Sequence, residues 1–334
     1  DFEKYLVEGI KEDPRNYPGD QKVLMRVMEV LSKHRLVSSQ LDRFFSNLKE
    51  MILLLKKHIG EEKDNKDKMD EYLSQVDERQ SMFGQIFQQV ITVKTNILTL
   101  QQKETDALKK RIETFSLSVK DFRKQFLDNA PFTFETSMTT SHVDQAYVSL
   151  DQFNLLLDKK KEEALKFNGL ENLFELEKTK YKSLQECVTD LCKLKQFWDA
   201  VGRILYTYES WRKTLWKNIR IDKLLPENEQ FVALLKQLPR EVKNFKAFPV
   251  LQETVSNMKR VLNCIEMLSS EAMQDRHWGM MSNEIHAEID HKSASFSFED
   301  IVRVNIYVHE AIVQETTENA NKEPKTDPQT HKNN

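Results

Sequence analysis

Hydrophobic residues recur at steps of three and four along most of the chain, which is the spacing of one face of an α-helix. The first stripe covers Gln21–Ile59, is polar only at Arg35 and Ser38, and predicts one long helix. Gly60 and the charge run at 61–68 follow, and they are interpreted as a solvated loop or helix end; a specific ionic docking site is the alternative. The apolar members of the stripe over Gln21–Ile59 include Leu24, Met28, Leu31, Leu41, Phe45, Leu48, Ile52 and Leu55.

A second stripe runs from Met69 to Phe126 without a proline, and its spacing is close to that of a coiled-coil heptad. An eight-residue step from Leu100 to Leu108 adds one residue to the heptad, so the supercoil should be disturbed there. The stripe can pack against helices of the same chain or form a seam for a partner chain. Bulky Phe115 and Phe122 favour a bundle within the chain over a two-stranded coil.

The segment 129–144 contains Pro131 and several Thr and Ser residues, and it is predicted to be a packed crossing between two helical units. We therefore predict a helical tail or stem segment over 1–130 and a second helical region over 131–323. Residues 324–334 contain two prolines and no apolar residue, which predicts a disordered C-terminal tail.

Two further helices are predicted after this crossing. The first covers Val143–Phe167 and should be interrupted at Gly169. The next apolar series begins at Leu170 and continues to Trp198. Leu225-Pro226 is expected to close the segment that follows, because proline disrupts a helix interior.

The stretch from Leu238 to Trp278 has the clearest helical pattern. Pro239 and Pro249 each stand where a helix could begin, since proline is tolerated in a first helical turn. A short helix is expected to open at Ala272 and to end near Arg276, His277 and Trp278. The apolar positions after Pro249 are Val250, Leu251, Val255, Met258, Val261, Leu262, Ile265 and Leu268.

This stretch resembles the N-terminal linker region of dynein heavy chains. The resemblance rests on the pattern Leu-Pro-x-x-Val-x-x-aromatic beginning at Leu238, an apolar helix, a methionine, and then Arg276-His277-Trp278. The segment 296–323 is similar to the element that comes next in the family. Leu191, Leu194 and Trp198, with the later Trp211 and Trp216, extend the resemblance to about residues 140–323.

The resemblance implies a mechanical role. In the family the linker lies across the ATPase ring and swings with the nucleotide cycle, while the tail binds other subunits. The implied partners are dynein intermediate and light chains, other heavy chains, and the downstream ATPase ring of the parent chain. The implied location is the cytoplasm and cytoskeleton, with a ciliary axoneme favoured. Pro239, Arg276, His277 and Trp278 are the expected structural motif, in which Trp278 and Arg276 lock helical units by packing and cation–π contact and His277 lies at a rim.

Composition agrees with an all-α, elongated, rod-like fold. The 334 residues include only seven Gly and eight Pro, and 31% are charged. A net charge of −3 argues against a nucleic-acid partner, and no apolar run reaches the length of a membrane span. Three cysteines without a pairing pattern indicate a reducing compartment. Because the first residue is Asp1, the chain is expected to be part of a longer protein.

Neither a catalytic nor a cofactor-binding site is predicted. Every glycine is isolated, so the chain lacks the phosphate-binding loop of ATPases. Cys187 and Cys192 are five residues apart on a predicted helix and should point to different faces, and His286 and His291 have the same unfavourable step, so neither pair suggests a metal site. His277 has no partner placed by the sequence to complete a catalytic triad.

Two functional hypotheses remain. The first is a non-catalytic tail-to-linker segment of a dynein heavy chain, which transmits force and supports subunit assembly. The alternative is a free-standing helical scaffold or tethering protein of the spectrin-like or coiled-coil type. A spectrin-like array should repeat about every hundred residues, and no internal repeat is evident. The end of the resemblance near residue 323 fits a truncated product, a splice form or an engineered end.

Overall fold

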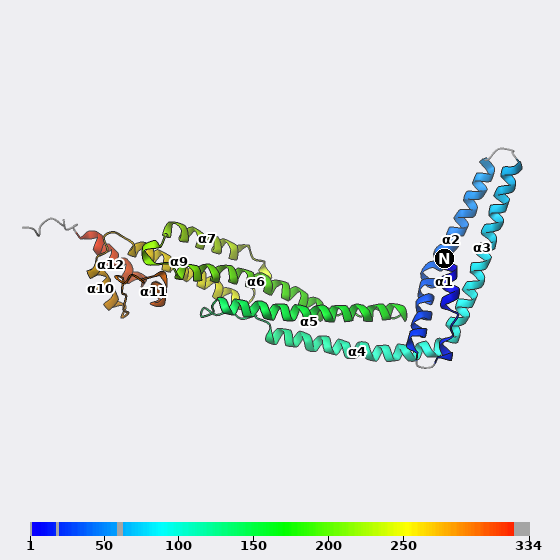
Figure 1. Cartoon of the computed structure of the whole chain (residues 1–334), viewed down its shortest axis with the longest axis horizontal. Coiled ribbons are helices and arrows are strands. Elements are labelled where there is room, and N and C mark those ends of the chain that lie inside the picture. The colour runs from blue at the N-terminus through cyan, green and yellow to red at the C-terminus, as the bar shows by residue number, and fades with distance from the viewer. Residues whose placement is uncertain (1, 18–19, 59–62, 324–334) are drawn as a thin grey trace, which may run out of the picture. The chain divides into compact units, whose positions relative to one another are not determined.

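The computed structural model describes residues 2–17, 20–58 and 63–323. Their regular structure is helical, apart from a single antiparallel bridge between Leu215 and Ser297, so the all-α prediction is confirmed. Figure 1 shows the helices in chain order. They are α1 (Phe2–Gly9), α2 (Gln21–His58), α3 (Lys63–Asn96), α4 (Leu98–Asn129), α5 (Thr140–Leu173), α6 (Lys182–Arg212), α7 (Ile221–Gln237), α8 (Arg240–Lys243), α9 (Ala247–Leu268), α10 (Asp275–Glu284), α11 (Phe298–Arg303) and α12 (Glu310–Lys322), with 3-10 turns η1 (Pro14–Asn16), η2 (Trp216–Asn218) and η3 (Ile306–His309).

The chain forms two compact units. Unit 1 contains residues 1–120 and 160–181, and unit 2 contains residues 121–159 and 182–334. The helices α4 and α5 each begin in one unit and end in the other, so these units do not follow the sequence-based division at residue 130. That division and the rod-like shape stay predictions.

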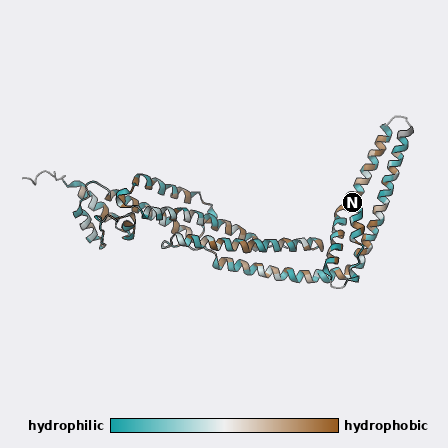
Figure 2. Cartoon of the chain, viewed as in Figure 1, coloured by the Kyte–Doolittle hydropathy of each residue, from teal (hydrophilic) through white to brown (hydrophobic). Residues whose placement is uncertain are grey.

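Unit 1 is built on an antiparallel hairpin of α2 and α3. Phe45 contacts Phe83 at a ring distance of 5.9 Å, and further along Lys49 and Lys56 pair with Asp77 and Asp70. Residues with higher numbers in α2 contact residues with lower numbers in α3, so the two helices are antiparallel. The expected helix over 21–59 is present as α2; Ile59, Gly60 and the first part of the charge run lie outside the described residues. Figure 2 shows hydrophobic positions recurring along both helices.

The second predicted stripe is not one continuous helix. It breaks at Ile97, between α3 and α4, and the chain changes direction there within unit 1 (Figure 1). Ile97 still donates its N–H to the Val93 carbonyl, so the chain bends sharply without a long loop. The hydroxyl of Thr95 bonds back to the carbonyl of Ile91, a contact that bends helices. The disturbance therefore lies just before Leu100, not between Leu100 and Leu108.

The first part of α4 packs against the last part of α5. The Phe115 ring contacts Phe167 at 5.0 Å and Tyr181 at 5.1 Å. The helix α5 continues through Gly169, contrary to the predicted interruption. A Cβ at this position would meet nothing within 4 Å, so Gly169 lies in open space, and one glycine costs an otherwise long helix only about 1 kcal/mol.

In unit 2, the loop between α4 and α5 is held by α6. The Trp198 indole N–H donates a 2.7 Å hydrogen bond to the Pro131 carbonyl. Phe134 is buried and contacts Phe197 and Trp198 at ring distances of 6.3 and 6.4 Å. The crossing is therefore a packed segment whose aromatic side chains are part of the core.

The remaining helices of unit 2 follow the apolar pattern, apart from the region of Pro226 and the start of α10. The helix α7 runs through Pro226, so Leu225-Pro226 does not close its segment. Pro226 lies within the first two turns, where few intrahelical hydrogen bonds precede it. Pro239 is the N-cap of α8, and Pro249 is the third residue of α9, as expected for prolines near helix starts.

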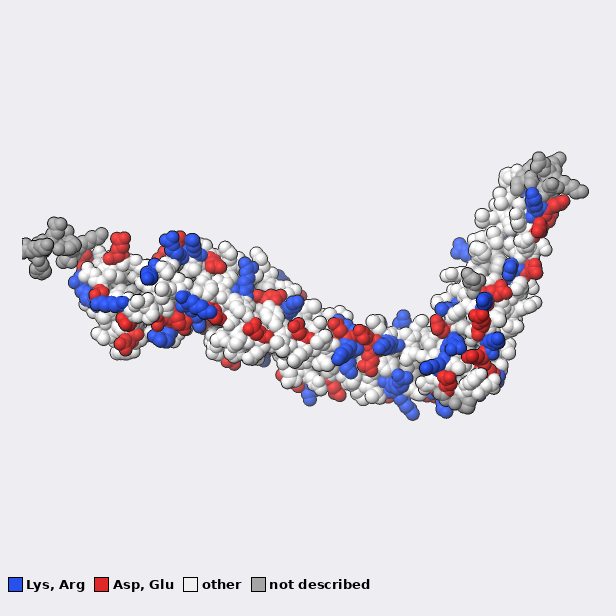
Figure 3. All heavy atoms as spheres, viewed as in Figure 1, with Lys and Arg blue, Asp and Glu red and all other residues white. Residues whose placement is uncertain are grey.

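Charged side chains of both signs alternate over the face drawn in Figure 3. Lys and Arg number 50 and Asp and Glu number 53 in the whole chain. On the face drawn in Figure 3, the two signs are interspersed among the described residues and do not form the basic stripe typical of nucleic-acid binding. Among the described residues, no helix combines the length and apolar character that crossing a bilayer requires.

Candidate functional site

The helix α10 begins where the sequence pattern suggested a helix end. Residues 270–273 form a turn closed by the Met273 N–H and the Ser270 carbonyl, at 3.1 Å. Gln274 then takes an extended conformation and serves as the N-cap of α10. Arg276, His277 and Trp278 therefore lie in the first turn of this helix. The first N–H groups of a helix have no carbonyl partner within the helix. The side chains of Arg276, His277 and Trp278 lie close to these groups at the start of α10.

His277 closes the start of α10. Its Nδ1 accepts a 3.0 Å hydrogen bond from the Gln274 backbone N–H, and its side chain is almost completely buried. Its other ring nitrogen, Nε2, lies 3.2 Å from Oε2 of Glu323. His277 is therefore not the rim residue that the sequence suggested, but a buried cap.

Arg276 contacts a carboxylate instead of the tryptophan ring. Its guanidinium hydrogen-bonds and pairs with Glu323, and in the described part of the chain no cation–π contact joins it to Trp278. The expected cation–π lock is therefore wrong. Hydrogen bonding from His277 and then from Arg276 lowers the pKa of Glu323, which keeps this carboxyl ionised. Glu323 follows the last residue of α12, so these contacts join α10 to the end of α12.

Trp278 lies in an aromatic cluster that comprises Trp216, Trp278, His291 and Phe296. Its side chain is 5% exposed. The His291 ring stacks on it at 5.1 Å, while Trp216 and Phe296 meet it edge to face at 5.6 and 5.9 Å. These are the favourable geometries for aromatic pairs. One side chain of α10 thus holds three segments together.

Backbone hydrogen bonds fix two of these segments in register. The Trp216 N–H donates to the Phe296 carbonyl at 2.8 Å, and the Phe298 N–H donates to the Thr214 carbonyl at 2.9 Å. The bridge Leu215–Ser297 lies between them. The connection between α6 and α7 is therefore joined to the segment before α11, directly beside the aromatic cluster.

Asp275, in the first turn of α10, orients the stacked histidine. Its carboxylate lies 2.6 Å from the Lys292 ammonium and 2.9 Å from Nε2 of His291. Lys292 and then His291 lower the pKa of Asp275. A carboxylate also suits the positive end of a helix dipole, so the pair supports both the helix start and the stack on Trp278.

Pro239 does not join this arrangement. It lies between α7 and α8, where its carbonyl accepts the N–H groups of Val242 and Lys243, both at 3.1 Å. The sequence missed Trp216, His291, Phe296 and Glu323 as members of the site. Aromatic spacing alone could not reveal them, because they come from segments far apart in the sequence.

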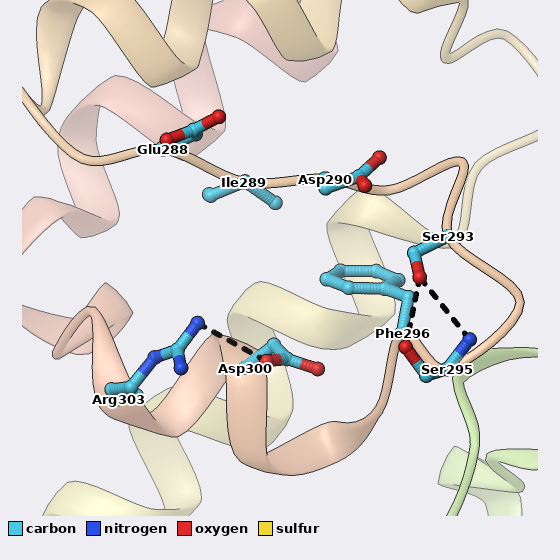
Figure 4. Close-up of a pocket in the computed structure, with 8 residues that line it drawn as sticks. All are labelled: Glu288, Ile289, Asp290, Ser293, Ser295, Phe296, Asp300 and Arg303. Carbon is cyan, nitrogen blue, oxygen red and sulfur yellow. Dashed lines mark hydrogen bonds and ion pairs between the residues drawn. The ribbon is translucent and has the colours of Figure 1, made fainter.

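A cavity of about 280 Å³ lies on another side of Phe296. Figure 4 shows the residues around it: Ile289 and Phe296 contribute apolar surface, and Glu288, Asp290 and Asp300 contribute carboxyl groups. Asp300 already pairs with Arg303 at 3.2 Å. In the described part of the chain, His, Cys, Asp and Glu side chains form no group of three or more that could hold a metal ion.

The two neighbouring cysteines of α6 face different surroundings. Cys187 is buried and Cys192 is exposed, as their five-residue step predicts. Burial raises the pKa of the Cys187 thiol, which reduces its reactivity. His286 and His291 also have different environments. His286 is exposed and has a positive φ of 54°, whereas His291 stacks on Trp278.

Replacing His277 with alanine is expected to lower the free energy of unfolding by about 1–3 kcal/mol, because the Gln274 N–H loses its buried acceptor. Urea denaturation followed by circular dichroism measures this change. His277→Asn is the matched variant, since its side-chain oxygen can replace Nδ1 as the acceptor, and it should recover part of the loss. A loss below about 0.5 kcal/mol for His277→Ala would contradict the capping role.

Comparison with known proteins agrees with the resemblance seen in the sequence. The family described as "Dynein heavy chain, N-terminal region 2" matches residues 184–332, which include the aromatic cluster and both sides of the α10 start. The match begins near the start of α6 and so lies within unit 2, as that unit is defined above.

Curated relatives extend the similarity over most of the chain. Human dynein axonemal heavy chain 9 is 29% identical over 260 residues, which cover 78% of this chain and 6% of that protein. The dynein beta chain, flagellar outer arm, of Chlamydomonas reinhardtii is 25% identical over 353 residues, covering 96% of this chain and 7% of the relative. The ciliary dynein beta chain of Heliocidaris crassispina is 24% identical over 307 residues, covering 91% and 6%. The chain thus spans only about 6–7% of the length of these relatives, and over residues 184–332 it is similar to N-terminal region 2 of dynein heavy chains.

Proposed function

We propose that this chain is a non-catalytic tail-to-linker segment of a dynein heavy chain, which supports microtubule-based movement by transmitting force and by assembling with other subunits. The observation that carries the proposal is the family match over residues 184–332, within a unit whose helices are joined by buried contacts. A segment that transmits force must resist deformation, and such contacts supply that resistance.

Buried polar bonds reinforce the packing of this unit. The Tyr208 hydroxyl donates to Oδ1 of Asn228 at 2.6 Å, and the Asn228 amide donates to the Val255 carbonyl at 3.3 Å. This chain of bonds joins α6, α7 and α9. Satisfied polar groups of this kind specify one arrangement of a core, because any alternative leaves a buried group unpaired.

A second tie lies near the end of the described chain. The Arg260 guanidinium pairs with Glu310 at 2.9 Å and donates to the Tyr307 carbonyl at 2.8 Å. It joins α9 to η3 and the start of α12. Together with the contacts of Arg276 and His277 to Glu323, it holds both ends of α12 against neighbouring helices.

The proposed partners follow from the relationship to dynein heavy chains. They are dynein intermediate and light chains, other heavy chains, and the ATPase ring of the parent chain. The proposed location is the cytoskeleton of a ciliary axoneme, because the relatives named above are axonemal, flagellar or ciliary dyneins. The alternative, a free-standing scaffold, predicts no association with a dynein motor.

Fractionation of an axonemal extract tests the assembly role. The protein that contains this chain, carrying an epitope tag, is expected to sediment with dynein ATPase activity and to co-precipitate other dynein subunits. A scaffold protein would instead separate from that activity. The continuation of the reading frame is an independent check, since six ATPase modules after this segment would establish a motor heavy chain.

We expect the purified 334-residue chain to hydrolyse no ATP, because it lacks a phosphate-binding loop. Phosphate release is measured after repeated purification, with a preparation from untransformed host cells as the control for contaminating ATPases. Activity that stays proportional to the chain through successive columns would contradict a non-catalytic role.

A further inference from the structure

The chain leaves the end of α5 through a residue with an unusual backbone conformation. Glu175 has a φ of 59°, in the left-handed region that favours glycine. The Glu175 N–H bonds to the Asn172 carbonyl at 3.4 Å, and the Leu176 N–H bonds to the Glu171 carbonyl at 2.8 Å. These two bonds form a Schellman motif, in which glycine is the usual residue at the position of Glu175. A glutamate at this position therefore costs backbone energy.

The side chain of Glu175 contacts both helices of the α2–α3 hairpin. Its Oε1 atom lies 2.8 Å from Nη1 of Arg35 on α2 and 3.2 Å from Nζ of Lys94 on α3. Arg35 also donates to the Asn172 carbonyl at 3.5 Å, in the last turn of α5, where a cation suits the negative end of the helix dipole. One carboxylate thus joins the end of α5 to two helices of unit 1, whose order along the chain is shown in Figure 1.

These contacts explain the polar interruption of the apolar stripe on α2. Arg35 and Ser38 are the polar members of that stripe, and the Ser38 hydroxyl donates to the Arg35 carbonyl at 3.4 Å. At Arg35, the side of α2 that carries the stripe meets the charged turn after α5. The stripe therefore changes from apolar to polar where it reaches Glu175.

The start of α2 is attached to α4 and α5 by apolar side chains. Leu24 of α2, Leu108 of α4 and Phe174 after α5 are buried and surround a small cavity of about 70 Å³. We call these three residues the apolar anchor. Arg35 lies 11 residues beyond Leu24 along α2, or about 17 Å from it. The hairpin is therefore held to α4 and α5 at two separate places with different chemistry.

Salt distinguishes these two attachments. Ion pairs between partly exposed groups weaken as ionic strength rises, since the Debye length falls from about 10 Å at ~0.1 M to about 3 Å at ~1 M. The side chains of Arg35, Lys94 and Glu175 are 41%, 45% and 39% exposed, so ions in solution reach them. Burial of apolar surface does not depend on charge. The contacts of Glu175 can therefore open while the apolar anchor stays closed.

We propose that Glu175 is a charge-operated clamp that fixes the direction of the α2–α3 hairpin within unit 1. With both ion pairs formed, the hairpin is held at the apolar anchor and at Glu175. When charge screening opens the ion pairs, the hairpin pivots about the apolar anchor. The clamp uses contacts within unit 1 alone, so the proposal is independent of the proposed dynein function.

The clamp accounts for a glutamate at a position that favours glycine. A glycine would ease the turn but would offer no carboxylate to Arg35 and Lys94. Glu175→Gly and Glu175→Gln therefore separate the two roles of the residue, because both remove the charge and only glycine relieves the backbone. A clamp requires that the two variants release the hairpin equally and differ at the end of α5.

The test measures the direction of the hairpin in the whole 334-residue chain. Nitroxide labels are attached after Leu54→Cys on α2 and Leu117→Cys on α4, where the side chains are 51% and 56% exposed. Cys192, the exposed cysteine of α6, is replaced with serine in every variant so that it takes no label. Double electron–electron resonance gives the distribution of distances between the two labels at ~0.1 M and ~1 M sodium chloride.

We expect Glu175→Gln at low salt to raise the ratio of the unclamped to the clamped distance population about fivefold, the effect of losing two partly exposed ion pairs. High salt should shift the unsubstituted chain in the same direction and leave Glu175→Gln nearly unchanged. Glu175→Gly should shift the populations as much as Glu175→Gln, while hydrogen exchange at the end of α5 becomes slower than in Glu175→Gln.

Asp77→Asn is the matched control, because it removes a 2.5 Å ion pair with Lys49 that joins α2 to α3 without involving α5. It should leave the distance distribution unchanged at both salt concentrations. Equal distributions for the unsubstituted chain and both Glu175 variants would overturn the proposal. So would a salt effect that persists in Glu175→Gln, or an equal shift in Asp77→Asn. Circular dichroism of each variant checks that the helices remain intact, so that a shift in distance reports movement and not unfolding.

Discussion

Replacing Trp278 with alanine is expected to lower the free energy of unfolding by about 3–5 kcal/mol. The substitution empties the centre of the aromatic cluster, where Trp278 is 5% exposed and contacts Trp216, His291 and Phe296. The backbone pairing between segments 214–216 and 296–298 limits how far the cavity can collapse. Urea denaturation followed by far-ultraviolet circular dichroism measures the loss without relying on tryptophan fluorescence.

Met280→Ala is the matched control, because Met280 lies two residues further along α10 and is 59% exposed. It should change the unfolding free energy by less than about 0.5 kcal/mol. Hydrogen exchange should place the Trp278→Ala loss in α10 and in the paired segments. Small and equal effects of the two substitutions would mean that Trp278 does not hold these segments together.

The same pair of variants separates stability from force transmission. In the full-length motor proposed as the parent of this chain, Trp278→Ala should reduce the speed of microtubule gliding more than it reduces ATP turnover, because the nucleotide sites lie elsewhere in that proposed parent. Met280→Ala should leave both unchanged. A parallel fall in both quantities would count against a force-transmitting role for this part of the chain.

Helix type and the buried faces could be predicted from the sequence because both depend on local spacing. The stripe from Leu108 to Phe126 is buried at every predicted position. So are Leu251, Val255 and Leu262 of α9. A three-and-four spacing determines which face a helix can bury, whatever its neighbour is.

Helix interruptions could not be predicted with equal success, because they depend on tertiary contacts and on small energy differences. Gly169 and Pro226 are both inside helices, since an unfavourable residue costs less than the packing of the whole helix contributes. The helix does break at Ile97, although no glycine or proline lies at that position. The Ile97 side chain is buried at this turn.

The site was only partly visible in the sequence. The Arg276-His277-Trp278 pattern points to the first turn of α10, but the sequence places the start of this helix at Ala272 instead of Asp275. The sequence places His277 at a rim, because it does not show that Gln274 adopts an extended conformation and needs an acceptor for its N–H. Glu323, at the end of α12, pairs with Arg276 and His277, which are far from it in the sequence. A local sequence pattern does not predict such a contact.

A similarly large effect is expected at the crossing between α4 and α5. Trp198 is 2% exposed and packs against Phe134 and Phe197, and its indole N–H holds the Pro131 carbonyl. Trp198→Ala should lower the free energy of unfolding by about 3–5 kcal/mol. Trp198→Phe keeps most of the apolar volume but removes the hydrogen bond, so it should cost less, about 1–3 kcal/mol.

Limited proteolysis distinguishes a packed crossing from a flexible tether. With Trp198 in place, the segment 130–139 should resist cleavage, and both substitutions should make it the first site cut, with Trp198→Ala cut faster. Leu155→Ala, at a position 63% exposed on α5, should leave the cleavage rate unchanged. If the segment is cut equally fast in all four proteins, the indole does not hold it, and force applied through α4 and α5 would pass through a loose connection instead of through the core of unit 2.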